Sequence, residues 1–166
     1  MRILAALVVP LALATTASSP VVRANGRIGP FRIDVTTERQ LRASLGKPDR
    51  VLREVVPPQK TLGRHLYYRC GRGCRTVYSF SNATGKLSDF QTTSPGFVTA
   101  HGSRVGMRGA EAARREGTRL VPGCGSGLYL HLRWDAHHTF VLTVWHGKVD
   151  GIVYLGPHSI YYDGLC

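Results

Sequence analysis

The stretch that decides the fold runs from Thr139 to Pro157 and reads TFVLTVWHGKVDGIVYLGP. The same order of features occurs once before, between Tyr78 and Pro95: an apolar run, a turn with Gly-Lys, a second run and a final proline. A fainter likeness connects residues 35–46 with residues 106–117. A repeat of about seventy residues is typical of one supersecondary unit used twice, not of a solenoid of many short units.

Each half of the chain is predicted to begin with a short helix. In the first half, Thr37 and Gln40 have the spacing of a capping box, and Gly46 gives a stop signal, so we expect a helix from Glu38 to Leu45. In the second half, a weaker copy from Ala110 to Glu116 lies between two glycines. Helices of this length need tertiary packing to be stable.

Strands are expected to follow each helix, because apolar and polar residues alternate with the period of half-buried strands. The fold class that results is α+β, with two tandem units, each a short helix packed on a mostly antiparallel four-stranded sheet. The units are predicted at residues 31–102 and 103–166. Their strands are expected at Leu66–Arg69, Arg75–Ser81, Lys86–Thr93 and Phe97–His101, and then at Leu128–Trp134, Thr139–Trp145, Lys148–Leu155 and His158–Tyr162.

This arrangement resembles a known family. The segment from Val35 to Asp49, with its Leu-Gly-x-Pro-Asp ending, and the Gly85-Lys86-Leu87 turn are similar to those of the tandem-repeat family of β-lactamase inhibitory proteins and SmpA/OmlA-type small outer-membrane lipoproteins. The resemblance implies a binding module without catalysis, and the inhibitor members hold partner proteins on an aromatic sheet surface. The chain departs from the lipoprotein members because it lacks their lipid-modified cysteine.

The amino-terminal segment predicts export. Residues 1–17 have the charged start, short apolar stretch and small-residue cleavage site of a signal peptide. The apolar stretch is too short for a bilayer of about 30 Å, so we expect no stable membrane insertion and a secreted or extracytoplasmic protein. Residues 18–30, rich in proline and glycine, are predicted to be a mobile leader.

Four cysteines in an exported chain favour disulfides over metal ligands or a thiol nucleophile. Three pairings are possible. Cys70 and Cys74 flank a short glycine-containing loop between two predicted strands, which favours a bridge between them. That pairing leaves Cys124 to bond Cys166.

The net charge of the chain indicates which partners it could attract, but it does not indicate a catalytic activity. The chain has 22 Lys plus Arg and 10 Asp plus Glu, a formal net charge of +12. Such a charge attracts polyanions, so one hypothesis is a cell-envelope structural protein held by anionic cell-wall polymers. An exported location argues against nucleic acid as the partner. The alternative explanation is that the positive charge only keeps the protein soluble, because the arginines are scattered along the chain and form no run.

No catalytic constellation is evident, and we predict a protein that is not an enzyme and has no cofactor or metal. The loop with Cys124 and Ser126 does not match a nucleophile elbow. A less favoured alternative is a secreted hydrolase, which would need His131, Asp135 and His137 to converge.

The favoured hypothesis is an exported protein-binding module whose partner is another secreted or envelope protein. Strict alternation places a second row of side chains opposite the apolar row of the second predicted sheet. Aromatic residues with arginine are typical of interface hot spots. The alternative is that the large rings belong to a core between the two units. The predicted binding residues are Tyr129, His131, Arg133, Thr143, Trp145 and Tyr154.

Overall fold

The computed structural model describes residues 19–56, 60–123 and 127–160. The predicted signal peptide and the predicted Cys124–Cys166 bridge lie outside these residues. The helices are α1 (Glu38–Leu45) and α2 (Gly109–Glu116). The strands are β1 (Val21–Val22), β2 (Arg27–Ile28), β3 (Phe31–Arg32), β4 (Arg50–Val56), β5 (Lys60–Gly71), β6 (Cys74–Ser81), β7 (Leu87–Thr92), β8 (Val98–Thr99), β9 (Leu120–Pro122), β10 (Leu128–Trp134), β11 (Thr139–Trp145) and β12 (Lys148–Leu155).

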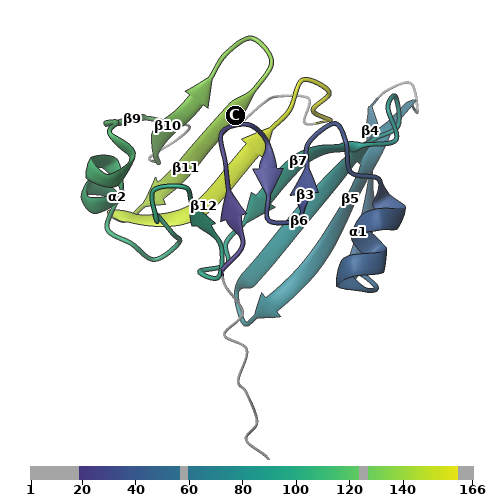
Figure 1. Cartoon of the computed structure of the whole chain (residues 1–166), viewed down its shortest axis with the longest axis horizontal. Coiled ribbons are helices and arrows are strands. Elements are labelled where there is room, and N and C mark those ends of the chain that lie inside the picture. Colours follow the sequence, from purple (N-terminus) through teal and green to yellow (C-terminus); the bar gives the residue numbers. More distant parts are fainter. Residues whose placement is uncertain (1–18, 57–59, 124–126, 161–166) are drawn as a thin grey trace, which may run out of the picture.

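One eight-stranded antiparallel sheet dominates the molecule, in the order β4-β5-β6-β7-β12-β11-β10-β9 (Figure 1). Strands β7 and β12 join its two halves, with Phe90 opposite Tyr154. The prediction of an α+β fold made of two helix-on-sheet units is therefore wrong, because the fold is mostly β and its main sheet is continuous. Pairing β7 with β12 satisfies backbone groups that two separate sheets would leave unpaired at their edges.

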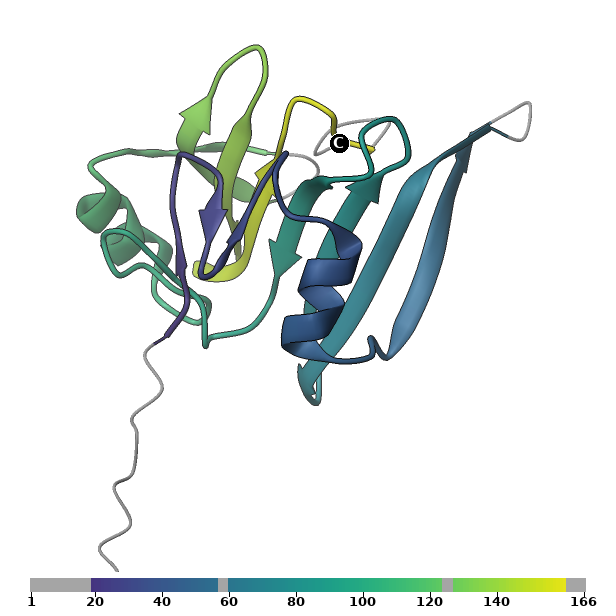
Figure 2. The same ribbon diagram turned by 45° about the vertical axis from the view of Figure 1, so that its right-hand side comes forward.

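A second, four-stranded sheet in the order β3-β2-β1-β8 lies across one face of the large sheet (Figure 2). Strands β1 and β2 come from the segment predicted to be a mobile leader, and Val22 and Ile28 are fully buried there. The structure thus corrects that prediction. A strand of two residues is too short to show an alternating pattern in the sequence. Gly26 and Gly29, at the turns on either side of β2, have positive φ angles, and glycines of this kind are typical of loops. The sequence pattern therefore indicated a loop here.

Both helices and the small sheet cover the same side of the large sheet, which we call the inner face. The main core lies between them and includes Leu41 of α1, Ala112 of α2, and Tyr78, Phe90 and Leu142 of the large sheet. The opposite side is called the outer face. Among the described residues, no helix is long and apolar enough to cross a membrane.

Helix α1 begins and ends where the sequence predicts. The Thr37 side chain accepts a hydrogen bond from the Gln40 backbone N–H, and the Gln40 side chain accepts one from the Thr37 backbone N–H. Leu41 is fully buried, whereas Leu45, one turn later in the helix, is 42% exposed. One large apolar residue therefore anchors this helix.

Strands β5 and β6 form the predicted hairpin, and the disulfide between Cys70 and Cys74 is confirmed, with a Cα–Cα distance of 5.1 Å. The last predicted strand of each half is wrong. Of Phe97–His101 only Val98 and Thr99 form a strand, and these pair in parallel with β1. Of His158–Tyr162, the described residues form no strand, and the Ile160 backbone N–H donates instead to Asp89 Oδ2.

Candidate functional site

A β-bulge in β10 divides the row of predicted binding residues. Tyr129 and His131 lie opposite Thr143 and Val141 on the outer face, as alternation predicts. The register then shifts between His131 and Arg133, so that Leu132 is the extra residue of the bulge. Arg133 thereby lies on the inner face, which corrects its predicted position.

The same shift brings Trp134 onto the outer face, because Trp134 lies opposite Thr139. Trp134 was not among the predicted binding residues, although it is 60% exposed. Alternation without a bulge puts it in the buried row. The sequence of β10 carries no glycine that marks the irregularity.

A second bulge, in β12, moves Tyr154 to the core. Thr143 pairs with Gly151 but Val144 pairs with Val149, so Asp150 is the extra residue. Tyr154 then lies opposite Phe140 with no exposed surface, and it is not a binding residue. Here the sequence did hold a signal, because an isolated glycine inside a strand pattern indicates a bulge.

The structure brings together the rings of three β10 residues on the outer face, and a fourth ring-bearing residue stands farther along the same face on β11. We call these four residues the aromatic surface: Tyr129, His131, Trp134 and Trp145. The rings of His131 and Trp134 stack with their centroids 4.5 Å apart, and those of Tyr129 and His131 are 6.2 Å apart. Trp145 is 45% exposed, and the predicted residue Thr143 lies two positions before it on the same face. The three β10 rings form a platform, and the Trp145 ring lies against His146 farther along the same face.

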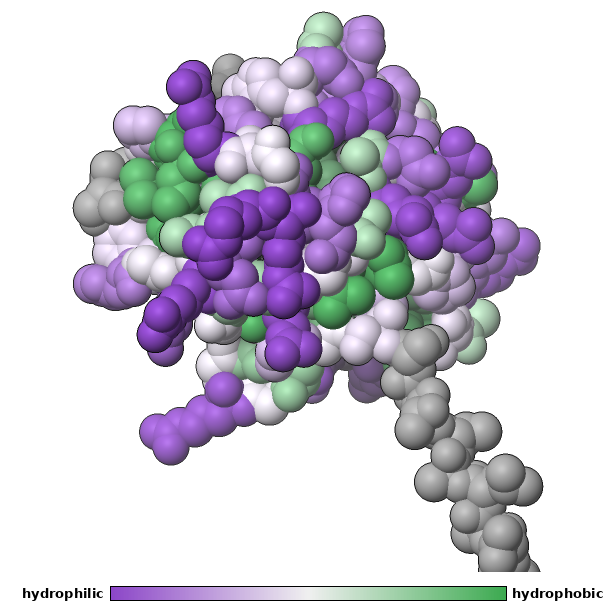
Figure 3. Space-filling model, turned by 60° about the vertical axis from the view of Figure 1, so that its left-hand side comes forward, coloured by the Kyte–Doolittle hydropathy of each residue, from purple (hydrophilic) through white to green (hydrophobic). Residues whose placement is uncertain are grey.

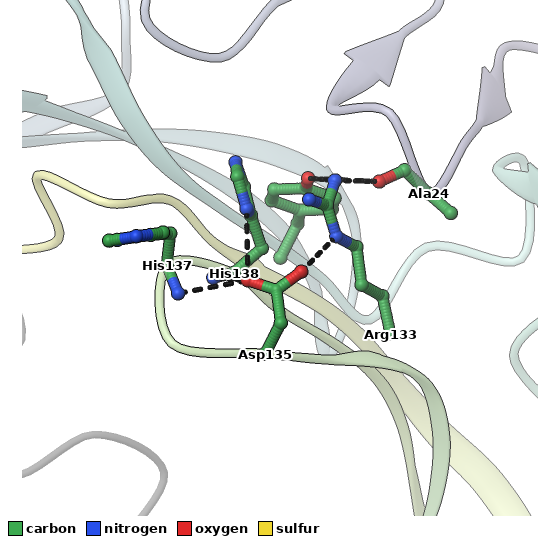
Figure 4. Close-up of polar contacts among 6 residues, drawn as sticks. Ala24, Arg133, Asp135, His137 and His138 are labelled. Carbon is green, nitrogen blue, oxygen red and sulfur yellow. Dashed lines mark hydrogen bonds and ion pairs between the residues drawn. The ribbon is translucent and has the colours of Figure 1, made fainter.

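A polar cluster at the β10–β11 turn fixes the end of this platform (Figure 4). Asp135 Oδ2 accepts a hydrogen bond from Arg133 Nε at 2.6 Å, and Asp135 Oδ1 accepts from the backbone N–H groups of His137 and His138 at 2.9 Å each. The hydrogen bond from Arg133, helped by those from the turn, holds the pKa of the Asp135 carboxyl well below its usual range. The carboxylate therefore stays ionised and keeps the turn closed.

The cluster also connects the turn to the amino-terminal strands. Arg133 Nη1 donates to the Ala24 carbonyl oxygen at 2.9 Å, and the Tyr154 hydroxyl donates to the same oxygen at 3.1 Å (Figure 4). Arg133 is thus held on the inner face by Asp135 of the turn and by the backbone of Ala24 in the amino-terminal segment.

We predict that Asp135→Ala loosens this turn without unfolding the protein. The backbone N–H groups of His137 and His138 lose their acceptor, so their hydrogen exchange should accelerate markedly, and the His131–Trp134 stack should weaken. NMR-detected exchange and tryptophan fluorescence measure both effects. Asp135→Asn is the matched control, because its amide oxygen still accepts from the turn. Equal exchange rates in Asp135→Ala and wild type would disprove the role of this carboxylate.

The residues of the hydrolase hypothesis do not converge. Asp135 contacts the backbone of His137, but the ring of His131 lies on the outer face against Trp134. Within the described ranges, no group of three His, Cys, Asp or Glu residues could hold a metal ion. The adjacent histidines His137 and His138 point apart in Figure 4.

Three residues from neighbouring strands of the first half form a Ser-His-Glu chain that the sequence did not reveal. His65 Nδ1 lies 2.8 Å from Ser79 Oγ, and His65 Nε2 lies 3.1 Å from Glu54 Oε2. This is the order of groups in a nucleophile–base–acid triad. Ser79 is only 1% exposed, however, so its hydroxyl has no access to a substrate. We interpret the chain as a structural network that satisfies buried polar groups.

Comparison with known proteins supports the fold. No protein family and no curated protein sequence matches the chain. Two solved structures are similar in fold. The uncharacterized protein YfeY from Escherichia coli has a TM-score of 0.55 and 13% identity, over 81% of this chain and 99% of that one. An extracellular protein containing a SCP domain from Bacillus anthracis str. Ames has a TM-score of 0.52 and 11% identity, over 92% of this chain.

The chain spans about half, 51%, of the Bacillus anthracis protein. At such low identities the two likenesses concern the fold alone. The resemblance to β-lactamase inhibitory proteins and SmpA/OmlA-type lipoproteins stays a prediction.

Proposed function

We propose that the protein is an exported, non-catalytic binding module that holds a partner protein through the aromatic surface. The observation that carries the proposal is the position of the two tryptophans. They are the only two in the chain, and they stand on the outer face with 60% and 45% of their surfaces exposed. The inner face has a complete core without them.

Exposed indole rings are costly in water and productive in an interface. Burying an aromatic side chain removes some 150 to 250 Å² of largely apolar surface, which is why tryptophan and tyrosine dominate binding hot spots. On the side of the molecule that carries α2, β9 and β10, hydrophilic side chains divide the apolar area into separate patches (Figure 3). This side carries α2 and is distinct from the aromatic surface, which lies on the outer face.

The disulfide supports an extracytoplasmic location. Bonded cysteines persist in oxidising compartments and are rare in the cytoplasm, and the Cys70–Cys74 bridge closes a loop at the tip of a hairpin. Together with the predicted signal peptide, it supports a partner that is itself secreted or attached to the envelope.

Truncating the two tryptophans tests the proposal. Trp134→Ala and Trp145→Ala should each weaken partner binding by about 2 kcal/mol, roughly thirtyfold, if these rings are central anchors. Wild type and variants are used as immobilised baits against extracytoplasmic extract, and the captured protein is then titrated with each variant by calorimetry. The melting temperatures should stay close to that of wild type, because both rings are largely exposed.

The matched control is Val55→Ala, which removes another exposed apolar side chain, 45% exposed, on the distant edge strand β4. It should leave binding unchanged. A captured protein that binds all three variants as tightly as wild type, or the absence of any specific captured protein, would refute the proposal. A sharp fall in the melting temperature of Trp145→Ala would place that ring in the structural core instead.

The excess of cations favours a second candidate, an envelope-associated structural protein held by anionic polymers. With a formal net charge of +12, attraction to a polyanion is unavoidable at low salt. Exposed charges are screened within about 10 Å at 0.1 M salt, so moderate salt should release such a protein from isolated envelopes. Retention through an apolar interface should survive the same wash, which separates the two candidates.

A further inference from the structure

A hollow of about 210 Å³ opens on the outer face where the two halves of the large sheet meet. We call it the seam pocket. Its walls come from four neighbouring strands, with Arg75 on β6, Gln91 on β7, Asp150 on β12 and Thr143 on β11. None of the residues of the aromatic surface lines it.

The missing side chain of Gly151 creates this hollow. Gly151 lies opposite Thr143 in the register, and a Cβ atom placed on Gly151 would lie 2.7 Å from Thr143 Oγ1. Any larger residue would therefore fill the floor of the pocket. The bulge next to Gly151 turns Asp150 out of the regular strand and into the pocket wall. The sequence thus leaves space where a β-sheet surface normally has a side chain.

The walls combine one cation, one anion and groups that both donate and accept hydrogen bonds. Arg75 supplies N–H donors, Asp150 supplies acceptors, and the Gln91 amide and Thr143 hydroxyl each supply both. Opposite charges in one pocket select against a ligand with a large net charge. Strand β7 separates Arg75 from Asp150, so their backbones are roughly two strand spacings, about 10 Å, apart. A ligand with polar groups spread around a ring matches that separation better than an amino acid, whose two charged groups are bonded to one carbon atom.

Two apolar side chains complete the lining of the pocket, Val77 on β6 and Val153 on β12. They offer apolar surface next to the polar walls. A ligand that satisfies both has an apolar face and a polar edge.

We propose that the seam pocket binds one unit of a neutral saccharide. A sugar ring has C–H groups on its faces and hydroxyls around its edge, which fits the apolar Val77 and Val153 beside Gln91, Thr143 and the charged groups. The volume lies below the roughly 300 Å³ at which pockets for drug-sized ligands begin, so it holds a single ring with the rest of the glycan outside. The proposal goes beyond the proposed function, because a saccharide can bind with or without a partner protein.

NMR titration of the protein with maltotetraose, cellotetraose and tetra-N-acetylchitotetraose tests it. At least one of the three should shift the backbone amide signals of Gln91, Thr143 and Gly151 in a saturable manner. Thr143→Val and Gln91→Leu should each weaken that binding about tenfold or more, because each removes hydrogen-bonding groups at little change in volume. Thermal melts of both variants confirm that they fold.

Thr139→Val is the matched control, because Thr139 lies on the same face of β11 but outside the pocket. It should bind the saccharide like wild type, and so should Trp134→Ala, which separates this site from the protein-binding surface. The proposal is overturned if none of the three saccharides shifts these amides, if free alanine shifts them instead, or if the folded pocket variants bind as wild type does.

Discussion

Tyr154→Ala is expected to lower the free energy of unfolding by about 3 to 5 kcal/mol, the range for truncating a fully buried aromatic residue. Tyr154 is 0% exposed and packs edge-on and tilted against His138 and Phe140. Its hydroxyl holds the Ala24 carbonyl oxygen, so the substitution also loosens the amino-terminal strands. Urea unfolding monitored by circular dichroism measures the change.

Two further variants separate the contributions. Tyr154→Phe keeps the ring and removes only the hydroxyl, so it should cost about 1 kcal/mol. Tyr129→Ala removes the same type of side chain from the half-exposed outer face and should cost much less than Tyr154→Ala. A Tyr154→Ala protein as stable as wild type would contradict the assignment of this residue to the core and reopen its predicted role in binding.

Asp89→Asn is expected to flatten the dependence of stability on pH in acid and to stabilise the protein near pH 8 by at most about 3 kcal/mol. Burial raises the pKa of the Asp89 carboxyl from 3.8 to about 6, although hydrogen bonds from Ile160, Ser159, Ser88 and Gly156 oppose this rise. Between pH 4 and pH 6 the folded state therefore binds more protons than the unfolded state. By linkage, the free energy of unfolding falls as pH rises through this window, by about 1.4 kcal/mol per pH unit at most.

The geometry favours asparagine at this position. Asp89 Oδ2 accepts from the Ile160 backbone N–H at 3.1 Å and from the Ser88 hydroxyl at 2.9 Å, and an amide oxygen can do the same. Oδ1 is buried without a hydrogen-bond partner in the described part of the chain. An NH₂ group there carries no charge but leaves its N–H donors without an acceptor, so it offsets only part of the cost of the buried charge. Unfolding free energies from pH 4 to pH 8 test this.

Asp150→Asn is the control, because Asp150 is exposed. It should leave the slope of stability against pH unchanged. If Asp89→Asn also keeps the wild-type slope between pH 4 and pH 6, the buried carboxylate is not its source.

The outer face thus divides into two regions with different roles. Across β4 to β6, Glu54, His65 and Ser79 form a row of polar groups bonded to one another. The seam pocket lies on β6, β7, β12 and β11, and the exposed rings lie on β10 and β11. Both proposed binding activities lie outside the bonded row.

Local interactions made several elements predictable. The capping box at Thr37 and the stop at Gly46 define α1 from side chains within one turn of it. The Cys70–Cys74 bridge follows from a hairpin whose loop is read directly from the sequence. Strands β10, β11 and β12 have the predicted bounds, because short turns read from the sequence separate them and apolar residues recur at every second position of β10 and β11.

Site residues were harder to predict, because each face assignment depends on every residue before it. Tyr129, His131, Thr143 and Trp145 share the outer face as the alternation predicts. Arg133 and Tyr154 do not, because one extra residue in β10 and one in β12 reverse the alternation beyond each bulge. A shift of one position sends every later side chain to the other face.

By itself the sequence determined α1, the hairpin disulfide and the bounds of β10, β11 and β12, all of which depend on neighbours close in the chain. The tertiary structure alone decided how the strands combine. It paired β7 with β12 across sixty residues, placed two-residue strands from the predicted leader over the core, and positioned both bulges. Those outcomes reduce the number of unpaired backbone groups and the area of exposed apolar surface over the whole molecule. Both quantities depend on contacts between distant residues, so no local sequence pattern encodes them.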